Sequence, residues 1–366
     1  MVCPPMTDAQ WLSIQSMRTF VQREIKPLAG ALRHAVLAHE QIMELTQAVA
    51  EFGLPGMAVP KALGGHGVDW MTQGRLFEEL SMGSVELATQ VLLNLLATTL
   101  IMQHPPLRER YLSDLVAGRI RVGMTLNGPT SALHGRRKGD AWMIDGRCDN
   151  VAVSSSTELL ICAVREHSTS SYLLLDRSQD RYEIRPYRDI EGEQQLSLQV
   201  TQARVPSWRW LGDASPDAPV TRHLFDVFKL HEAVIQLARG QALLDASIAR
   251  AKTTTQFGRP IAAQHLVVMQ FAELITQLDA ARLMCGQGLG LLDTGKLDSK
   301  TARRARLLTT ETAQRIERRI SRIDNSTARQ SYSTDWPYVY SALPLLSENI
   351  EEDAQQIADE LIGELP

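Results

Sequence analysis

The most informative stretch of the chain is Gly53-Leu-Pro-Gly-Met-Ala-Val-Pro-Lys-Ala-Leu-Gly-Gly-His-Gly-Val-Asp69. Its two glycine clusters interrupt a region that otherwise favours helices. Apolar residues recur at three- and four-residue spacing in residues 12–32 and 39–52, and residues 71–102 also permit helix. The sequence therefore predicts an N-terminal helical domain over residues 1–118, with a glycine-rich turn region inside it.

Residues 119–212 have a different period. Two short β-type runs, residues 158–165 and 171–176, precede residues 196–201, which alternate apolar and polar side chains as a half-buried strand does. Polar or glycine-containing turns separate these runs. We therefore predict a small antiparallel β domain in the centre of the chain.

The region from residue 213 to residue 366 returns to a helical period. Three apolar stripes at three- and four-residue spacing predict the seams of a helical bundle. The last helix is expected to begin near Asn349, because Asn349 and Glu352 have the spacing of a capping box. We predict a C-terminal four-helix bundle and an α+β, mostly helical fold class. The stripes are Leu224, Val227, His231, Val234 and Ala238; Val267, Phe271, Leu274, Leu278 and Ala281; and Leu308, Thr312, Ile316, Ile320 and Ile323.

The composition excludes several classes of protein. The 366 residues include 38 Lys and Arg against 42 Asp and Glu, and a net charge of −4 gives no field for nucleic acid or an anionic membrane. The longest strongly apolar run, residues 91–102, is too short to insert across a bilayer, and no secretory signal is evident. The four cysteines form no CxxC pair or Cys/His cluster, so we expect a cytoplasmic chain without disulfides or a metal site.

Two further patterns have a structural and a functional interpretation. Gly286-Gln-Gly288-Leu-Gly290 is close to a dinucleotide fingerprint, but its third glycine is misplaced and it follows a helix, so a glycine-rich helix is favoured. The arginines of residues 303–322 are interleaved with acidic residues, which favours a solvated bundle face over an anion-binding site.

Four segments, in order along the chain, resemble the acyl-CoA dehydrogenase family. The glycine-rich stretch followed by Phe77-Glu-Glu-Leu80 is similar to its N-terminal signature, and Tyr111-Leu-Ser-Asp-Leu-Val-Ala-Gly118 to its entry into the β domain. Residues 196–212 are similar to the last strand and exit of that domain. Gln256-Phe-Gly-Arg-Pro-Ile261 resembles the entry to the second helix of the bundle.

The resemblance implies a flavoprotein oxidoreductase of fatty acid metabolism. Family members bind FAD, and a carboxylate removes the α-proton of an acyl-CoA thioester while the β-hydrogen leaves as hydride to the flavin. The expected partners are an acyl-CoA or other acyl-thioester substrate and an electron-transferring flavoprotein. The expected assembly is a homo-tetramer or dimer, or a hetero-oligomer with a related subunit.

The resemblance also implies individual site residues. Glu348, just before the last helix, matches the position of the catalytic base, although the acidic residues near it also suit a helix N-terminus. Some relatives carry the base at the position of Leu230, which makes the nearby Glu232 a second candidate. The expected substrate contacts are Ser131, Asn349 and His231, which matches a substrate-side arginine but also lies on an apolar stripe. The expected cofactor contacts are Thr125, Leu126, Asn127, Ser154, Gln256, Phe257, His265 and Ile350.

Several flavin-binding positions depart from the family pattern. Thr254 replaces an arginine that contacts the pyrophosphate, and Ala152 replaces a hydroxyl residue of the second flavin strand. Residues 328–332 stand where the family has a Gly-Gly turn, and the segment before Glu348 is shorter and lacks the family's Arg-Asp pair. Five losses of about 1 kcal/mol each would weaken FAD binding several thousandfold.

Three functional interpretations remain open from the sequence. The first is an acyl-thioester dehydrogenase that uses FAD and Glu348. The second is a non-catalytic, FAD-poor subunit of a hetero-oligomeric acyl-CoA dehydrogenase, which the departures favour. The third is a flavin monooxygenase or a dehydrogenase of carrier-protein-bound acyl groups with the same fold, because fold alone does not determine chemistry.

Overall fold

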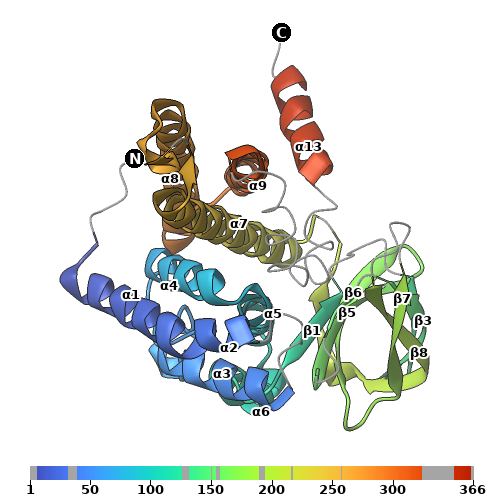
Figure 1. The fold of residues 1–366 in the computed structure, drawn as a ribbon. Coiled ribbons are helices and arrows are strands. Elements are labelled where there is room, and N and C mark those ends of the chain that lie inside the picture. Colours follow the sequence, from blue (N-terminus) through green and yellow to red (C-terminus); the bar gives the residue numbers. More distant parts are fainter. Residues whose placement is uncertain are drawn as a thin grey trace.

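The computed structural model describes residues 6–31, 39–125, 132–149, 151–153, 157–188, 194–215, 217–256, 258–323 and 350–363. Helices come first along the chain, strands follow, and helices return at the end. Figure 1 shows the two helical groups side by side, with the strands gathered at one end of them. The predicted fold class, α+β and mostly helical, is confirmed.

The N-terminal helices divide where a serine interrupts the helical run. The stretch of residues 71–102 holds two helices because Ser84 is extended and its Oγ accepts a hydrogen bond from Leu87 N at 3.2 Å, which caps the second one. A π-helical turn, Val21–Ile25, links the first two helices. The helices are α1 (Asp8–Phe20), α2 (Lys26–Ala31), α3 (His39–Glu51), α4 (Trp70–Gly83), α5 (Val85–Ile101) and α6 (Pro105–Val116).

The glycine-rich stretch folds into a compact turn region between α3 and α4. A Cβ atom at Gly65 would meet the carbonyl oxygen of Gly56 at 2.7 Å, so the two glycine clusters pack backbone against backbone. Gly64 has a φ of +87°, which residues with a side chain rarely adopt. The predicted turn therefore needs its glycines both for packing and for backbone conformation.

The β domain is a mixed sheet. Neighbouring strands of this sheet follow the order β4–β1–β5–β2–β3–β8–β7, and β6 pairs with β5 and β9. β5 runs parallel to β1 and β2, so the prediction of a purely antiparallel domain is wrong. Side-chain alternation shows which face a strand buries but not the direction of its neighbour, and the long connection from β1 to β5 permits a parallel return. The strands are β1 (Val122–Thr125), β2 (Leu133–Lys138), β3 (Ala141–Cys148), β4 (Val151–Ala152), β5 (Leu159–Glu166), β6 (Thr169–Asp176), β7 (Tyr182–Arg188), β8 (Gln194–Pro206) and β9 (Trp210–Asp213).

The C-terminal helices form the predicted bundle. All five stripe residues of α7 are at most 2% exposed, and the central stripe residues of α8 and α9 are buried too. The hairpin strands β10 (Thr255–Gln256) and β11 (Arg259–Pro260) connect α7 with α8. The helices are α7 (Pro219–Thr253), α8 (His265–Asp293), α9 (Ser299–Ile323) and α13 (Ile350–Gly363).

The glycines between residues 286 and 290 lie inside α8, as the helical interpretation predicts. A Cβ atom at Gly288 would meet Leu230 Cδ2 at 2.5 Å. The missing side chain therefore allows α8 and α7 to approach closely, since the separation of packed helices depends on the side chains at their contact. This glycine serves helix packing and not nucleotide binding.

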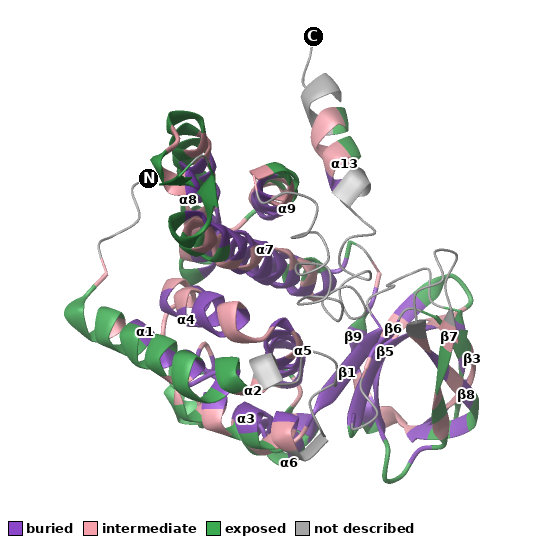
Figure 2. Cartoon of the chain, in the orientation of Figure 1, coloured by how far each residue is buried: buried purple, intermediate pink, exposed green. Residues whose placement is uncertain are grey.

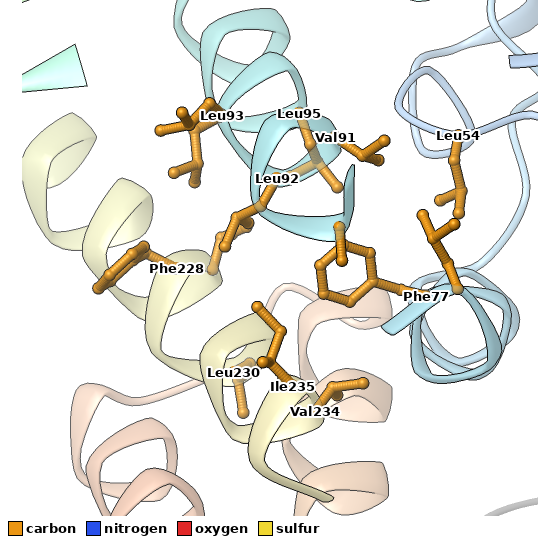
Figure 3. Close-up of a cluster of buried hydrophobic side chains, with 14 of the residues drawn as sticks. Leu54, Phe77, Val91, Leu92, Leu93, Leu95, Phe228, Leu230, Val234 and Ile235 are labelled. Carbon is orange, nitrogen blue, oxygen red and sulfur yellow. The ribbon is translucent and has the colours of Figure 1, made fainter. Parts of the chain in front are cut away.

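One apolar core joins the two helical groups. Phe77 of α4, Leu92 of α5 and Ile235 of α7 lie together in it and are at most 1% exposed (Figure 3). The inner sides of α4, α5 and α7 are buried, whereas the outer sides of α1 and α8 are exposed (Figure 2). Burial of this size makes hydrophobic packing the main force that holds α7 against the N-terminal helices.

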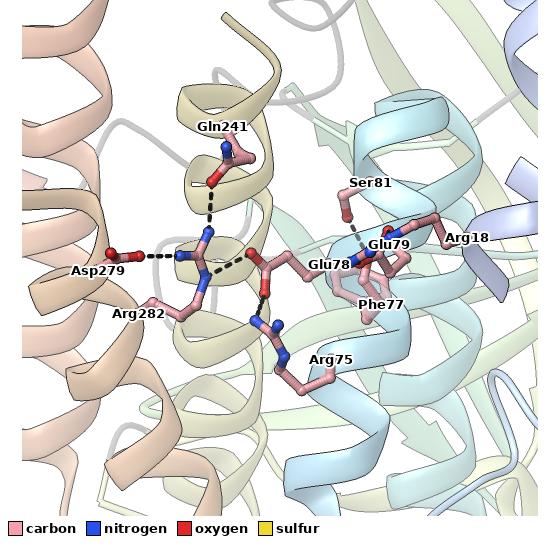
Figure 4. Close-up of polar contacts among 9 residues, drawn as sticks. All are labelled: Arg18, Arg75, Phe77, Glu78, Glu79, Ser81, Gln241, Asp279 and Arg282. Carbon is pink, nitrogen blue, oxygen red and sulfur yellow. Dashed lines mark hydrogen bonds and ion pairs between the residues drawn. The ribbon is translucent and has the colours of Figure 1, made fainter. Parts of the chain in front are cut away.

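A polar network reinforces this contact at its edge (Figure 4). Arg282 of α8 donates from Nε to Glu78 of α4 at 3.0 Å and from Nη2 to Gln241 of α7 at 2.9 Å. Arg75 also pairs with Glu78, so this carboxylate receives two cations. The network links three helices whose residues lie far apart in the sequence and thereby fixes the frame around the site.

Candidate active site

Strands β1 and β4 form the edge of the sheet from which the predicted flavin segments depart. They pair antiparallel, with Thr125 opposite Val151. Two buried amides of α5 hold β1: Gln90 Nε2 donates to Val122 O at 3.1 Å, and Asn94 Oδ1 accepts from Val122 N at 3.2 Å. These bonds satisfy backbone groups that would otherwise be buried without partners. The edge is therefore held between a helix and the sheet.

Thr125 is turned into the sheet. Its side chain is 1% exposed, and its hydroxyl oxygen accepts a hydrogen bond from Ala163 N of β5 at 2.9 Å. A hydroxyl with this burial and this partner stabilises the pairing of β1 and β5. The O–H hydrogen of Thr125 is not used in this bond and can be donated to a further group.

Gln256 and His265 lie on an exposed corner beyond the end of α7. Gln256 pairs with Arg259 across the β10–β11 hairpin, where all four strand residues are exposed. Gln256 Oε1 accepts a long hydrogen bond, 3.4 Å, from Gln264 Nε2. His265, the first residue of α8, is exposed as well. The hairpin therefore offers an amide, a guanidinium and an imidazole to an external group.

The two predicted halves of the cofactor site lie at opposite ends of α7. The strands come before Pro219, where α7 begins, and the hairpin follows Thr253, where it ends. A helix of 35 residues is about 50 Å long. The hairpin of one chain therefore lies at the far end of α7 from β9, the strand that directly precedes this helix.

His231 lies on the side of α7 that faces α4. It is fully buried, with Trp70 and Phe77 against its ring edges. Its Nδ1 lies 2.7 Å from Val227 O, which only accepts, so Nδ1 carries the hydrogen and Nε2 accepts from Gln73 Nε2 at 3.2 Å. Burial lowers the pKa of His231 to about 4, so the ring is neutral.

A chain of hydrogen bonds connects this histidine to the glycine-rich turn. Gln73 Oε1 accepts from Ala58 N at 3.1 Å, while its amide nitrogen bonds His231. With both ring nitrogens engaged and no exposed surface, His231 has the core arrangement that the apolar stripe indicated. It joins the N-terminal domain to α7 and has no free nitrogen for a substrate.

Glu232, the next residue of α7, faces α9 and α13. Its side chain is 1% exposed and forms an ion pair with Arg306 Nε of α9. Neither of its oxygens accepts a directed hydrogen bond from the residues that the structure describes. Burial raises the pKa of Glu232 to about 7, and the nearby Arg306 offsets only part of this effect. As a candidate base, Glu232 is thus a buried, ion-paired carboxylate.

Arg306 also reaches the last helix. Its Nη1 donates to Asp353 Oδ2 of α13 at 2.8 Å, and Lys229 Nζ of α7 donates to Asp353 Oδ1 at the same distance. We call Lys229, Glu232, Arg306 and Asp353 the ion quartet. Sequence reasoning missed the quartet as a group, because its members come from three helices; a charged residue among the apolar positions of α9 was the only signal for it.

The remaining predicted site residues lie outside the described part of the chain, or begin an element whose side chains are not described. Ile350 is the first residue of α13. The residues that lie outside are Leu126, Asn127, Ser131, Ser154, Phe257, Glu348 and Asn349. In the described residues, no group of His, Cys, Asp or Glu is arranged to hold a metal ion, and no helix has the length and apolarity of a membrane span.

Comparison with known families identifies the class of protein. The family model "Acyl-CoA dehydrogenase, N-terminal domain" matches residues 7–119, and "Acyl-CoA dehydrogenase, C-terminal domain" matches residues 218–323. These are the two helical groups that meet around α4, α5 and α7. The chain belongs to the acyl-CoA dehydrogenase family.

Individual relatives are similar over most of the chain. It is 26% identical over 329 residues to the probable acyl-CoA dehydrogenase YngJ of Bacillus subtilis, covering 85% of this chain and 86% of that protein. It is 24% identical over 303 residues to the caffeyl-CoA reductase-Etf complex subunit CarC of Acetobacterium woodii, covering 75% and 77%.

Solved structures show the same fold. The glutaryl-coenzyme A dehydrogenase in complex with glutaryl-CoA superposes with a TM-score of 0.86 at 20% identity, over 98% of this chain and 96% of that one. A glutaryl-CoA dehydrogenase from Mycobacterium smegmatis in complex with FADH2 superposes with a TM-score of 0.84 at 15% identity, over 99% and 96%.

The described residues fit FAD at one of the two predicted places. The exposed hairpin offers donors, including Arg259, which suit the phosphate groups of a dinucleotide. Thr254, at the position of the family's arginine, is itself exposed but uncharged. At the strand edge, the residues that directly follow Thr125 lie outside the described part of the chain.

Proposed function

We propose that this chain is a flavoprotein dehydrogenase of acyl thioesters, with FAD as its cofactor. The observation that carries the proposal is the position of α13. This helix begins two residues after Glu348, and the ion quartet anchors it against α7. Asn349 alone separates Glu348 from the first residue of this helix, so the position of the helix limits the reach of the carboxylate. This suits a general base, whose reach to the proton must be held within a fraction of an ångström.

In the proposed reaction, Glu348 takes the α-proton of the acyl thioester and holds it. When bound, FAD accepts the two electrons and the hydrogen that leave the β-carbon as hydride. The product is then the α,β-unsaturated thioester. The expected reoxidant is an electron-transferring flavoprotein, and the similarity to a subunit of an Etf complex supports this.

The separation of the two halves of the site supports a homo-oligomer. Because about 50 Å of α7 separates the hairpin from the strand edge, we propose that a second copy supplies its hairpin to the cofactor of the first. The beginning of α8, beside the hairpin, exposes Leu266 (75%) and Met269 (55%). Large exposed apolar side chains next to a proposed shared site suit an interface between copies.

The proposal is tested by loading the purified chain with FAD, desalting it, and measuring acyl-CoA oxidation with an artificial electron acceptor. We expect about one FAD per chain and turnover with at least one acyl-CoA. Loss of a general base costs about 10²- to 10⁴-fold, so Glu348→Gln is expected to lose that much activity while keeping FAD. Equal activity of Glu348→Gln and the unmodified chain would remove Glu348 from the mechanism.

A second candidate function is a non-catalytic, FAD-poor subunit of a hetero-oligomer. The uncharged Thr254 at the position of the family's arginine favours it, because the hairpin then has one cation fewer for the pyrophosphate. The FAD-loading experiment also separates the two candidates. A chain that stays colourless after incubation with FAD supports the non-catalytic subunit, and a stoichiometric flavin band opposes it.

A further inference from the structure

The side chains described in α13 include one buried charge. Among the side chains described in this helix, residues 353–359, only Asp353 is buried. It is 2% exposed, whereas Asp359, one and a half turns later, is exposed and accepts a hydrogen bond from Gln355. Apolar side chains of α13 such as Ile357 are half-buried, so the carboxylate adds a specific polar contact to the packing of this helix.

Two cations hold that carboxylate from two different helices. Lys229 of α7 bonds one oxygen and Arg306 of α9 bonds the other, each at 2.8 Å. Glu232 balances the charge of Arg306, so the quartet has two cations and two anions. Because each oxygen has its own cation, the position and the rotation of the carboxylate are both specified.

Stability alone does not account for this arrangement. Buried ion pairs lose the hydration of both partners and are often no more stable than apolar side chains of similar volume. Their best-supported advantage is specificity, because a charged group tolerates only one arrangement of its partners. The side chains of Glu232, Arg306 and Asp353 are 1%, 1% and 2% exposed, so this desolvation applies in full.

The quartet acts on the chain segment that carries the proposed base. Asp353 is five residues after Glu348, and α13 begins at Ile350. A chain spans at most about 3.6 Å per residue, so fixing Ile350 confines the Cα of Glu348 to within about 7 Å of it. Lys229 and Glu232 flank Leu230, the α7 position that the resemblance matches to the base of some relatives.

We propose that Asp353, held by Lys229 and Arg306, is a positioning residue for Glu348. The inference rests on the proposed function, because it assigns the task of the base to Glu348. The four charges of the quartet orient the first turn of α13, and their contribution to the stability of the fold is secondary.

The test compares Asp353→Asn with Asp359→Asn, an exposed aspartate of the same helix, in FAD-loaded protein. A misplacement of about 1 Å costs on the order of 100-fold in rate, so we expect Asp353→Asn to lower kcat by about 10- to 100-fold and to leave KM within about twofold. Asp359→Asn is expected to match the unmodified chain. Equal kcat values for the two variants would overturn the inference.

A double-variant cycle separates positioning from general loosening. If Asp353 acts through Glu348, Asp353→Asn in a Glu348→Gln background lowers kcat by less than about twofold further, since there is no base left to position. If the two substitutions instead lower kcat independently, so that their fold-losses multiply in the double variant, the inference is overturned. An inactive unmodified chain, or a fully active Glu348→Gln variant, instead overturns the proposed function and with it the premise.

Lys229 provides a second route if Asp353→Asn does not fold. Its side chain is 15% exposed, so removing its charge leaves less buried charge unpaired than removing Arg306. Lys229→Met is expected to lower kcat with KM unchanged, and Lys229→Arg, which keeps a cation, is expected to restore at least half of it. Equal loss in both variants would contradict a role for the charge.

Discussion

The two sides of α7 solve the problem of a buried polar residue in different ways. On one side, His231 is neutral, both of its nitrogens are bonded, and the surroundings are apolar. On the other side, the adjacent Glu232 is surrounded by charges, and its pKa is raised to about 7. The histidine side joins two domains by ordinary packing, whereas the glutamate side fixes one helix by charge. The charged arrangement around Glu232, which tolerates fewer changes in its partners, therefore lies next to the segment that carries the proposed base.

The largest effect on the free energy of unfolding is expected when the ion quartet loses Arg306, its central cation. Arg306→Met leaves Glu232 and Asp353 buried without it, which typically costs about 3–5 kcal/mol. Urea unfolding measures the free energy of unfolding, and Arg304→Met, at an exposed position of α9, is the control. The control is expected to change stability by less than about 1 kcal/mol. Equal effects would mean that the quartet is not held charged in the interior.

Replacing the charges of the ion quartet with apolar side chains should separate the stability of the fold from the positioning of α13. A chain with Lys229→Met, Glu232→Leu, Arg306→Met and Asp353→Leu together is expected to recover the stability lost in Arg306→Met, because no member of the quartet is then charged. Its acyl-CoA turnover is nevertheless expected to stay about 10-fold or more below that of the unmodified chain. Recovery of both stability and turnover would show that an apolar contact positions α13 equally well.

The two sides should also respond to pH in opposite directions. The pKa of His231 falls from 6.5 in the unfolded chain to about 4, so acidification through that range protonates the unfolded chain first and lowers stability by roughly 3 kcal/mol. The pKa of Glu232 rises from 4.5 to about 7, so acidification from pH 7 to 4.5 protonates the folded chain first and raises stability.

Unfolding free energies of His231→Gln and Glu232→Gln, measured from pH 7.5 to 4.5 and compared with the unmodified chain, test this sign difference. His231→Gln is expected to lose less stability on acidification than the unmodified chain, and Glu232→Gln more. Differences of the same sign in both variants would contradict the contrast between the two sides.

The smallest effect on stability is expected at the exposed start of α8. Leu266→Lys with Met269→Lys should leave the free energy of unfolding within about 0.5 kcal/mol, because both side chains are exposed in the single chain. Sedimentation velocity should show dissociation of the assembly, while Thr276→Lys, at another exposed α8 position, should not. An intact assembly in the double variant would place the interface elsewhere.

Periodicity was sufficient to predict much of the fold. The α7 stripe from Leu224 to Ala238 is buried as its spacing indicates, because a helix of period 3.6 places such residues on one side. The glycines of residues 53–67 form the predicted turn. The direction of β5 was not predictable, since strand alternation is the same in parallel and antiparallel pairs.

The candidate site was less predictable than the fold. Whether the hydroxyl of Thr125 faces a ligand or the sheet depends on the register with β5, which sequence alone does not contain. The bonds of Asp353 join residues 124 and 47 positions apart, so no local pattern indicates them. The resemblance marks Gln256 as a cofactor position, but only the structure shows that it lies on an exposed hairpin.

The most direct test of the account is the visible spectrum of the FAD-loaded chain on anaerobic mixing with a panel of acyl-CoA thioesters. The account predicts that at least one thioester bleaches the flavin band, and that Glu348→Gln slows the bleaching by about 100-fold or more. A flavin band that no thioester bleaches, in a chain that holds one FAD, would contradict the proposed dehydrogenase and the role of Glu348 as its base.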